Sequence, residues 1–248
     1  MSKVMLITGA SRGIGAATAR LAARQGYRVI VNYQRNRDAA DALVESIITL
    51  GGEALAVQAD VADQDQVRRL FAAIDERLGR LDVLVNNAGM LEQQMRLEQM
   101  SLERWQRVFA TNVYGSFLCS REAIARMSTR QGGRGGAIVN VSSIAARLGA
   151  PGEYIDYAAA KGAVDSMTVG LAKELADDGI RVNAVRPGVI DTEIHASGGE
   201  PQRVARVAAS IPLGRGGRAE EVAEAILWLA GEQASYTTGS LLDVSGGR

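Results

Sequence analysis

The chain has very few cysteine, histidine and aromatic residues. Its 248 residues include one cysteine, Cys119, and one histidine, His195, and aromatic residues make up 4% of the total. A single cysteine excludes an internal disulfide, which suits a reducing compartment. One Cys and one His cannot supply the usual structural zinc tetrahedron or a His-rich catalytic zinc site. We therefore expect no bound metal.

The chain also lacks net charge and long hydrophobic runs. Its 28 Lys and Arg residues balance 28 Asp and Glu residues, so no electrostatic argument favours a nucleic-acid or anionic-membrane partner. No apolar run is long enough to span a bilayer, and Met1-Ser2-Lys3 leads into a predicted strand without a signal-peptide pattern. These absences favour small-molecule chemistry, and we expect a cytoplasmic protein.

Short β-branched runs alternate with longer amphipathic segments along the chain. This alternation is typical of βαβ units and a parallel sheet, and the length suits one domain spanning residues 1–248. We predict an α/β, doubly wound fold with helices on both faces of a parallel sheet. The predicted strands are Val4–Ile7, Arg28–Asn32, Ala54–Gln58, Val83–Asn86, Ala137–Val141, Arg181–Val185 and Ser240–Val244. The predicted helices are Gly13–Arg24, Arg37–Leu50, Asp63–Leu78, Leu102–Met127, Tyr154–Ala176 and Glu220–Leu229.

A glycine-rich turn follows the first predicted strand. It reads Thr8-Gly9-Ala10-Ser11-Arg12-Gly13-Ile14-Gly15 and leads into a helical pattern. Strand, turn and helix in this order let backbone N–H groups and the positive end of a helix approach a pyrophosphate. The spacing is G-x-x-x-G-x-G rather than the commoner G-x-G-x-x-G, and an ordinary tight turn is the structural alternative. The pattern predicts a dinucleotide site in a Rossmann fold.

A tyrosine and a lysine stand four positions apart in a predicted helix. Tyr157 and Lys161 therefore share one helix face. A phenol has an unperturbed pKa of about 10, and a cation held beside it stabilises the phenolate and lowers that pKa. Such a pair alone often only decorates a helix surface. Together with the glycine turn, it indicates acid–base catalysis on a cofactor-bound substrate.

The ordered motifs resemble those of the short-chain dehydrogenase/reductase family, in its compact single-domain branch, from Val4 to Gly247. They are the glycine turn, Asp60-Val61, Asn86-Asn87-Ala88-Gly89, Asn112, Val139-Asn140-Val141-Ser142-Ser143, the Tyr157 and Lys161 pair, Arg186-Pro187-Gly188 with Thr192, and Thr238 to Gly247. The resemblance implies an oxidoreductase that interconverts a carbonyl and a secondary alcohol by hydride transfer from or to a nicotinamide.

The resemblance also implies roles for four catalytic residues. Tyr157 is the general acid for carbonyl reduction, Lys161 lowers its pKa and binds the nicotinamide ribose, and Ser143 hydrogen-bonds the substrate oxygen. Asn112 holds a water for proton relay next to the lysine. The interval from Ser143 to Tyr157 is one residue longer than the commonest family spacing, and Ser142 would lengthen it by one more. We prefer Ser143, because it directly follows the strand.

The end of the second predicted strand decides between the two nicotinamide cofactors. A NAD site usually places Asp or Glu about 20 residues beyond the glycine turn, but here the strand ends Val31-Asn32-Tyr33-Gln34-Arg35. Guanidinium groups at Arg12 and Arg35 suit a 2′-phosphate, so we predict NADP(H). With the positions that the family resemblance implies, the predicted cofactor-binding residues are Gly9, Ser11, Arg12, Gly13, Ile14, Gly15, Asn32, Arg35, Asp60, Val61, Asn87, Ala88, Gly89, Tyr157, Lys161, Pro187, Gly188, Val189 and Thr192.

The substrate is less determined than the reaction. The segment His195–Pro201 is small and polar, and we favour a 3-oxoacyl thioester or another small carbonyl compound, with a sugar or polyol as the alternative. Two other classes stay open. Gly9-Ala10-Ser11-Arg12-Gly13 also spells the nucleophile elbow of α/β-hydrolases, with Asp191 and His195 as conceivable partners. The third reading is a cofactor-binding sensor without catalysis.

Apolar residues on several faces of the predicted helix Leu102–Met127 indicate burial against a partner. The last predicted helix and the sheet-edge strand Ser240–Val244 suggest a second contact, and the family resemblance points to the same segments. We expect a homotetramer. We also expect the Gly-, Ser- and Ala-rich segment Gly188–Leu213 to order over the cofactor and the substrate.

Overall fold

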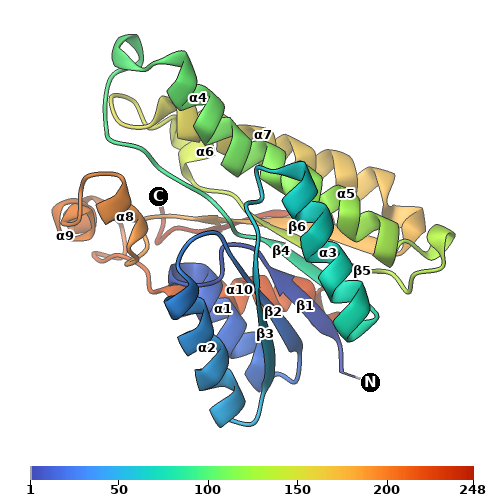
Figure 1. The fold of residues 1–248 in the computed structure, drawn as a ribbon. Coiled ribbons are helices and arrows are strands. Elements are labelled where there is room, and N and C mark those ends of the chain that lie inside the picture. Colours follow the sequence, from blue (N-terminus) through green and yellow to red (C-terminus); the bar gives the residue numbers. More distant parts are fainter. Residues whose placement is uncertain (1) are drawn as a thin grey trace.

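A seven-stranded parallel sheet forms the centre of the structure, a computed structural model that describes residues 2–248 (Figure 1). The strand order is β3-β2-β1-β4-β5-β6-β7, and every neighbouring pair is parallel. The strands are β1 (Val4–Ile7), β2 (Arg28–Tyr33), β3 (Glu53–Gln58), β4 (Val83–Asn86), β5 (Gly136–Val141), β6 (Ile180–Pro187) and β7 (Leu241–Val244). The predicted α/β, doubly wound fold is confirmed.

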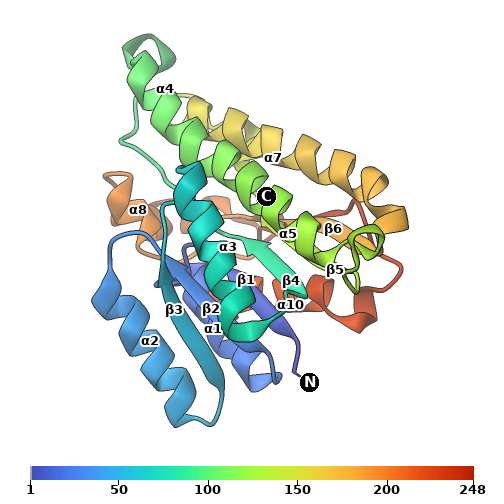
Figure 2. The same ribbon diagram turned by 45° about the vertical axis from the view of Figure 1, so that its right-hand side comes forward.

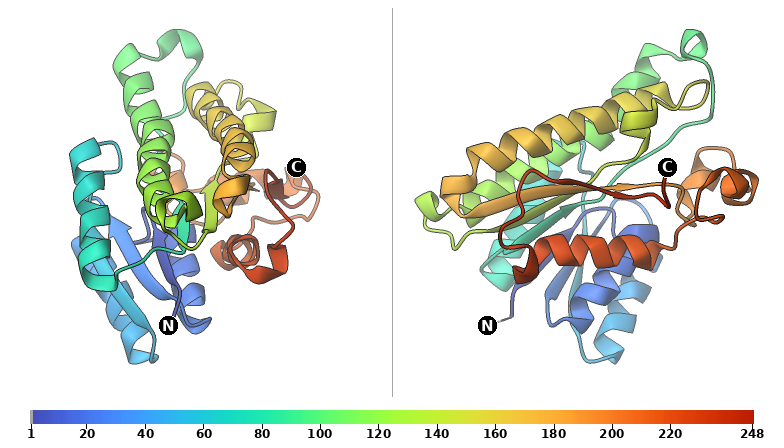
Figure 3. Two further views of the ribbon diagram at one scale, coloured as in Figure 1. Left: turned by 90° about the vertical axis from the view of Figure 1, so that its right-hand side faces the viewer. Right: turned by 180° about the vertical axis from the view of Figure 1, so that it is seen from behind.

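Helices cover both faces of the sheet (Figure 3). One face packs on α1 (Gly13–Arg24), α2 (Arg37–Thr49) and α10 (Ala219–Ala230), and the other on α3 (Gln64–Leu78), α5 (Gly115–Met127) and α7 (Ile155–Glu174). Alternate residues of each strand enter the two cores: Met5 and Ile7 pack on the first side, and Val4 and Leu6 on the second. Both faces are therefore apolar, as a buried parallel sheet requires.

The long helix predicted over Leu102–Met127 is interrupted in the structure. It consists of α4 (Leu102–Phe109), a π-helical turn η2 (Ala110–Tyr114) and α5, which run end to end beside α7 (Figure 2). The side chain of Asn112 donates to the Val108 carbonyl at 2.9 Å and to the Met90 carbonyl at 3.1 Å. A side chain that enters the backbone ladder in this way accounts for the wider turn.

Short helices occupy segments where no element was predicted, apart from Ala176, which ends the predicted helix Tyr154–Ala176 and begins η4. They are α6 (Ala145–Leu148), α8 (Ile194–Ser197) and α9 (Arg203–Val207), with single 3₁₀ turns η1 (Leu97–Gln99), η3 (Thr129–Gln131), η4 (Ala176–Asp178), η5 (Ala208–Ser210) and η6 (Glu232–Ala234). In residues 2–248, no helix has the length and apolar character needed to cross a membrane.

The strand order reverses between β1 and β4, whose chain connections lead to opposite edges of the sheet. In a doubly wound sheet this reversal opens a crevice at the carboxyl ends of the strands. The glycine turn, Asn87, Ser143 and Pro187 all lie at this edge. The topology thus gathers the sequence motifs at one place.

Candidate active site

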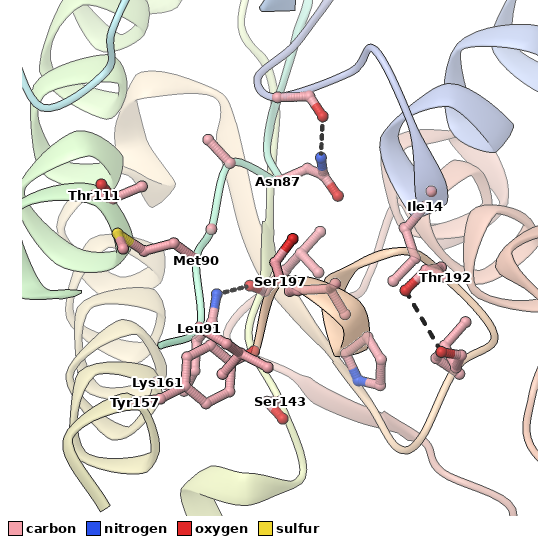
Figure 4. A pocket seen from close by; sticks show the side chains of 18 of the residues that line it. Ile14, Asn87, Met90, Leu91, Thr111, Ser143, Tyr157, Lys161, Thr192 and Ser197 are labelled. Atoms are coloured by element: carbon pink, nitrogen blue, oxygen red, sulfur yellow. Dashed lines mark hydrogen bonds between the residues drawn. The ribbon is translucent and has the colours of Figure 1, made fainter. Parts of the chain in front are cut away.

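A cavity of about 1000 Å³ opens at the carboxyl edge of the sheet (Figure 4). Segments after β1, β2, β3, β4, β5 and β6 line it, together with residues of η2 and α7. Of the predicted cofactor-binding residues, all except Gly15 line this cavity. The cavity is large enough for a dinucleotide and a small substrate together, since ligand pockets commonly measure about 300–1000 Å³.

The glycine turn offers an anion site at its helix end. Helix α1 begins at Gly13, its N-cap Arg12 makes no side-chain cap, and its first turn carries no acidic residue. The first backbone N–H groups of α1 therefore have no side-chain acceptor and point toward an approaching anion. Gly9 and Gly13 adopt φ values of +60° and +54°, which favour glycine. These features fit the pyrophosphate of a dinucleotide.

Gly15 has a packing role that differs from its predicted one. A Cβ placed there would lie 2.5 Å from Asn87 Nδ2 and 2.8 Å from Ala10 Cα. The glycine therefore lets α1 approach the turn and the end of β4, and it does not line the cavity. Gly15 thus supports the turn by packing, and its contact with the cofactor stays a prediction.

Two asparagines brace the glycine turn from neighbouring strands. Asn32 Oδ1 accepts from the Gly9 backbone N–H at 3.2 Å. Asn87 Nδ2 donates to the Thr8 carbonyl at 2.8 Å and to the Gly9 carbonyl at 3.1 Å. Both residues also line the cavity, so they combine a structural function with a place in the site.

Two arginines line the cavity at the end of β2 and in the glycine turn. Both Arg12 and Arg35 are exposed, and among residues 2–248 neither side chain forms an ion pair. Gln34 and Asn36, not carboxylates, flank Arg35 in the lining, and Gln34 Nε2 donates to Asp60 Oδ2 at 2.6 Å. Asp60 and Glu193 also line the cavity, but neither forms an ion pair with Arg12 or Arg35 in the part of the chain that the structure describes, so both guanidinium groups are available to an anionic ligand.

Tyr157 and Lys161 extend from α7 into the cavity, and their side chains lie together (Figure 4). Lys161 Nζ is 5.5 Å from the centre of the Tyr157 ring and donates to the Val141 carbonyl at 2.7 Å. Burial lowers the pKa of Lys161 to about 8, and the charge of Asp165 raises it by less. The lysine is thus held at a fixed position by a backbone acceptor.

The expected depression of the tyrosine pKa does not appear in this structure. Burial raises the pKa of Tyr157 to about 12, and a hydrogen bond with Ser143 lowers it by less. The reason is that desolvation of the enclosed phenol disfavours the phenolate more strongly than the neighbouring groups favour it. At neutral pH the phenol carries its proton, which is the form that can donate to a carbonyl oxygen.

The two adjacent serines have different surroundings. Ser143 lines the cavity and lies close enough to Tyr157 to lower the pKa of the phenol, and its Oγ accepts from the Ala145 backbone N–H at 3.1 Å. Ser142 is also in the lining, but its Oγ donates to the Lys161 carbonyl at 3.2 Å. The geometry therefore favours Ser143 as the partner of Tyr157, in line with the preferred alignment.

Asn112 lies behind the cavity wall. Its side chain is fully buried, and its Oδ1 accepts from the Met90 backbone N–H at 3.2 Å. A Cβ on Gly89 would lie 2.9 Å from Asn112 Oδ1 and 3.6 Å from Lys161 Nζ, so these three residues converge. The side chain shapes the loop after β4 and η2 and does not line the cavity.

His195 is a loop anchor that also lines the cavity. It is buried, and its Nε2 lies 2.8 Å from the Ile190 carbonyl. Burial lowers the pKa of His195, so the ring is neutral at pH 7. Because its ring nitrogens hydrogen-bond neither Ser11 nor Asp191 in residues 2–248, the hydrolase triad is not formed.

Sequence patterns missed several lining residues at the substrate end of the cavity. They are Met90, Leu91, Thr111, Ile144, Leu148, Ile194 and Arg203. They belong to loops and short helices without a regular period, and only folding brings them together. Among the described residues 2–248, no cluster of three His, Cys, Asp or Glu side chains could hold a metal ion.

Comparisons with known proteins assign the chain to a family. A family model described as enoyl-(acyl carrier protein) reductase matches residues 9–248. A solved structure described as a short-chain type dehydrogenase/reductase from Mycobacterium marinum superposes with a TM-score of 0.92 and is 39% identical, over 99% of this chain and 94% of that one. The chain belongs to the short-chain dehydrogenase/reductase family. The resemblance seen in the motifs is thereby confirmed.

Two curated relatives span nearly the whole chain. An uncharacterized oxidoreductase, YgfF, of Escherichia coli strain K12 is 58% identical over 99% of both chains. A 3-oxoacyl-[acyl-carrier-protein] reductase of Synechocystis is 45% identical over 99% of this chain and 96% of the relative. The protein is an oxidoreductase of this family, whose carbonyl and alcohol chemistry implies a nicotinamide cofactor.

Proposed function

We propose that the protein is an NADP(H)-dependent oxidoreductase that interconverts a small carbonyl compound and its secondary alcohol. The observation that carries the proposal is one cavity with Tyr157, Lys161 and Ser143 along its wall and with Arg12 and Arg35 at another part of its lining. Within residues 2–248, neither guanidinium group forms an ion pair. The whole chain acts as one catalytic domain. The cofactor supplies the hydride when it is bound.

In carbonyl reduction, Tyr157 donates its phenolic proton to the substrate oxygen as negative charge develops there. Ser143 stabilises the same oxygen by a hydrogen bond. Lys161 lies close enough to stabilise the resulting phenolate and to hold the nicotinamide ribose. Asn112 acts from behind the wall, where it fixes the loop that carries Gly89 beside the lysine.

A 3-oxoacyl thioester is the first substrate candidate, because a relative with 45% identity is named for that activity. A sugar or polyol is the second candidate. Polar side chains at the substrate end, among them Glu153, Ser197 and Arg203, favour hydroxyl-rich ligands. A parallel screen with acetoacetyl-CoA, small ketones and aldoses separates the two. A protein that binds NADPH but converts none of them would be a sensor.

Replacing Tyr157 by Phe tests the proposed reaction. Tyr157→Phe keeps the ring volume but removes the transferable proton, so turnover should fall by about two to four orders of magnitude. The dissociation constant for NADPH should stay near that of the parent. Steady-state kinetics and cofactor fluorescence measure the two effects, and near-normal turnover would refute the role of the tyrosine.

We also propose a homotetramer in the cytoplasm. Tyr114 and Phe117 on η2 and α5 are 56% and 50% exposed, and Trp228 on α10 is 44% exposed. Large apolar side chains on two separate helical surfaces favour two kinds of subunit contact. Light scattering at micromolar concentration tests this, and a mass near 26.3 kDa, that of one chain, would contradict it.

A further inference from the structure

A buried ion pair joins α4 to the start of the helix that carries Tyr157. Arg104 Nε donates to Asp156 Oδ2 at 2.6 Å, and Nη2 donates to Oδ1 at 3.2 Å. The side chains are 3% and 1% exposed. Asp156 directly precedes Tyr157 in the first turn of α7, so the pair lies one residue from the proposed proton donor.

The pair also holds two backbone groups of the site. Arg104 Nη1 donates to the Gln93 carbonyl at 2.5 Å. Gln93 belongs to the loop after β4, which contributes Met90 and Leu91 to the cavity wall. Asp156 Oδ1 accepts from the Tyr157 backbone N–H at 2.9 Å. One guanidinium therefore connects α4, the start of α7 and the substrate-side loop.

Helix α4 contacts the tyrosine directly one turn after Arg104. Val108 and Val113 form a small apolar cluster with Ala160, and the Tyr157 ring packs against this cluster. Since residues four apart on a helix share a face, Arg104 and Val108 act on α7 from the same side. The backbone of Tyr157 is fixed by the ion pair and its ring by the apolar contact.

Stability alone does not explain a fully buried pair of this kind. Removing two charges from water costs several kcal/mol per ion, and an apolar pair of similar volume is often as stable or more stable. The two parallel N–H···O bonds instead impose one geometry on both partners. Such geometric constraint matters most where a reaction depends on alignment.

We propose that Arg104 and Asp156 are positioning residues for the reaction at Tyr157. They hold the first turn of α7 and the loop carrying Met90 and Leu91 at a fixed separation, so that the phenol meets the substrate oxygen. The inference rests on the role proposed above for Tyr157. A misplacement of about 1 Å at a reacting group can cost about a hundredfold in rate.

The double variant Arg104→Met with Asp156→Leu tests this inference. It replaces the ion pair by an apolar pair, so the thermal midpoint should be equal to or above that of the parent. With acetoacetyl-CoA and NADPH, kcat should fall about tenfold to a hundredfold, while the dissociation constant for NADPH stays within about twofold. A folded double variant with the kcat of the parent would overturn the proposal.

A matched control comes from a second two-pronged ion pair away from the cavity. Arg126 on α5 donates to Asp75 on α3 through Nε and Nη2 at 2.7 to 3.0 Å. Arg126→Met with Asp75→Leu should leave kcat unchanged, because neither residue lines the cavity. An equal loss of kcat in this control would show that the effect at Arg104 is a general one.

Two further measurements keep the inference testable if the apolar pair does not fold. Arg104→Lys keeps the charge but loses the two-pronged contact, and kcat should fall without a change in cofactor affinity. Amide hydrogen exchange in residues 88–96 and 155–160 should accelerate in the same variant, whether or not a substrate is turned over. Exchange and kcat both equal to those of the parent would overturn the inference.

The exchange measurement also separates the two proposals. Failure of the parent on every substrate, or full turnover by Tyr157→Phe, would remove the proposed function. The Tyr157 amide would still report whether the Arg104 and Asp156 pair fixes the start of α7. Accelerated exchange there would support the constraint, and unchanged exchange would refute it.

Discussion

Two clusters of arginine and carboxylate groups hold the segments around the cavity, and they differ in their exposure to water. Arg104 and Asp156 are sealed between α4 and α7. After β6, Glu200 accepts from Gln94, Arg203 and Arg206, and Arg206 is 53% exposed. We call Gln94, Glu153, Glu200, Arg203 and Arg206 the Glu200 cluster, since Arg203 also donates to Glu153 at 2.5 Å.

Arginine–carboxylate ion pairs therefore constrain the two regions to different degrees. Arg104 and Asp156 form an ion pair only with each other in residues 2–248 and are nearly closed to solvent, so removing either side chain leaves an uncompensated charge. In the Glu200 cluster, two arginines share two carboxylates near the surface, where water and salt compete for each contact. We therefore expect the buried pair to hold α4 and α7 at a fixed position and the Glu200 cluster to form contacts that can open.

Removing one carboxylate from each cluster should give the largest difference in stability between them. Asp156→Ala leaves the Arg104 guanidinium buried without its counter-ion, and the free energy of unfolding should fall by about 3–5 kcal/mol. Glu200→Ala should change it by at most about 1 kcal/mol. Urea titrations of both variants measure the difference, and equal losses would contradict the contrast.

Lys161 is a buried amine that forms no ion pair with a carboxylate in residues 2–248. It therefore shows what an unpaired buried charge costs, in contrast to the paired Arg104 and Asp156. Its pKa is lowered to about 8, whereas the unfolded value is about 10.4. The unfolded state therefore binds more protons between these values, and stability rises with pH through this window. Below about pH 8, the charged lysine destabilises the fold by its full amount.

Lys161→Met should remove this cost. We expect a gain of about 1–3 kcal/mol at pH 7, because loss of the hydrogen bond to the Val141 carbonyl offsets part of it. The gain should disappear as the pH approaches about 10.4, and turnover should be lost at every pH. Thermal melts across pH 7 to 10 check the prediction. A constant or negative stability difference would mean that the site carries no such strain.

The glycine turn and the pair of Tyr157 and Lys161 could be predicted from the sequence, because each forms a local pattern. The glycine turn, Tyr157 and Lys161 are defined by their spacing within one strand-to-helix unit or one helix. The sheet followed from the alternation of apolar runs. Strand ends shifted by only a few residues, as at β6, which extends to Pro187, because pairing and not propensity decides where a strand stops.

The two charged clusters could not be predicted in the same way. Arg104 and Asp156 are far apart in the sequence, and each looks like an ordinary charge on a helix surface until α4 and α7 meet. The interruption at Asn112 escaped prediction for a similar reason, because its side-chain bonds reach Met90 in another loop. Contacts between distant segments depend on packing, which has no local period.

Arg35 extends the comparison to an exposed guanidinium that has no carboxylate partner. If Arg35 binds the 2′-phosphate as proposed, Arg35→Asp removes that contact and adds repulsion, so the preference for NADPH over NADH should fall about tenfold to a hundredfold. Arg20→Asp is the matched control, since Arg20 is exposed on α1 and does not line the cavity. Fluorescence titration with both cofactors measures the ratio. Equal affinities of the parent for the two cofactors would refute the NADP(H) assignment.

Substitution of Arg203 in the Glu200 cluster should have the smallest effect on the free energy of unfolding, but it should increase the rate of amide exchange nearby. Arg203 joins α9 to Glu153, and its guanidinium lies 5.2 Å from the centre of the Tyr154 ring. Arg203→Gln removes these charge contacts but keeps a polar side chain of comparable reach. Amide exchange in residues 188–213 should then accelerate, with a change in the free energy of unfolding of at most about 1 kcal/mol.

The response of amide exchange to salt and to NADPH should differ between the Glu200 cluster and the buried pair of Arg104 and Asp156. Raising the salt concentration to about 1 M shortens the screening length to about 3 Å, so exchange in residues 188–213 should accelerate in the parent. It should accelerate less in Arg203→Gln, where only the Arg206 ion pairs with Glu200 and Glu153 remain to be screened. NADPH should slow exchange in the parent as the segment orders over the cofactor. Because Arg104 and Asp156 are sealed from solvent, exchange in residues 155–160 should not respond to salt. If salt changed amide exchange equally in the two segments, the difference in burial between the two clusters would not explain how firmly each holds its segment.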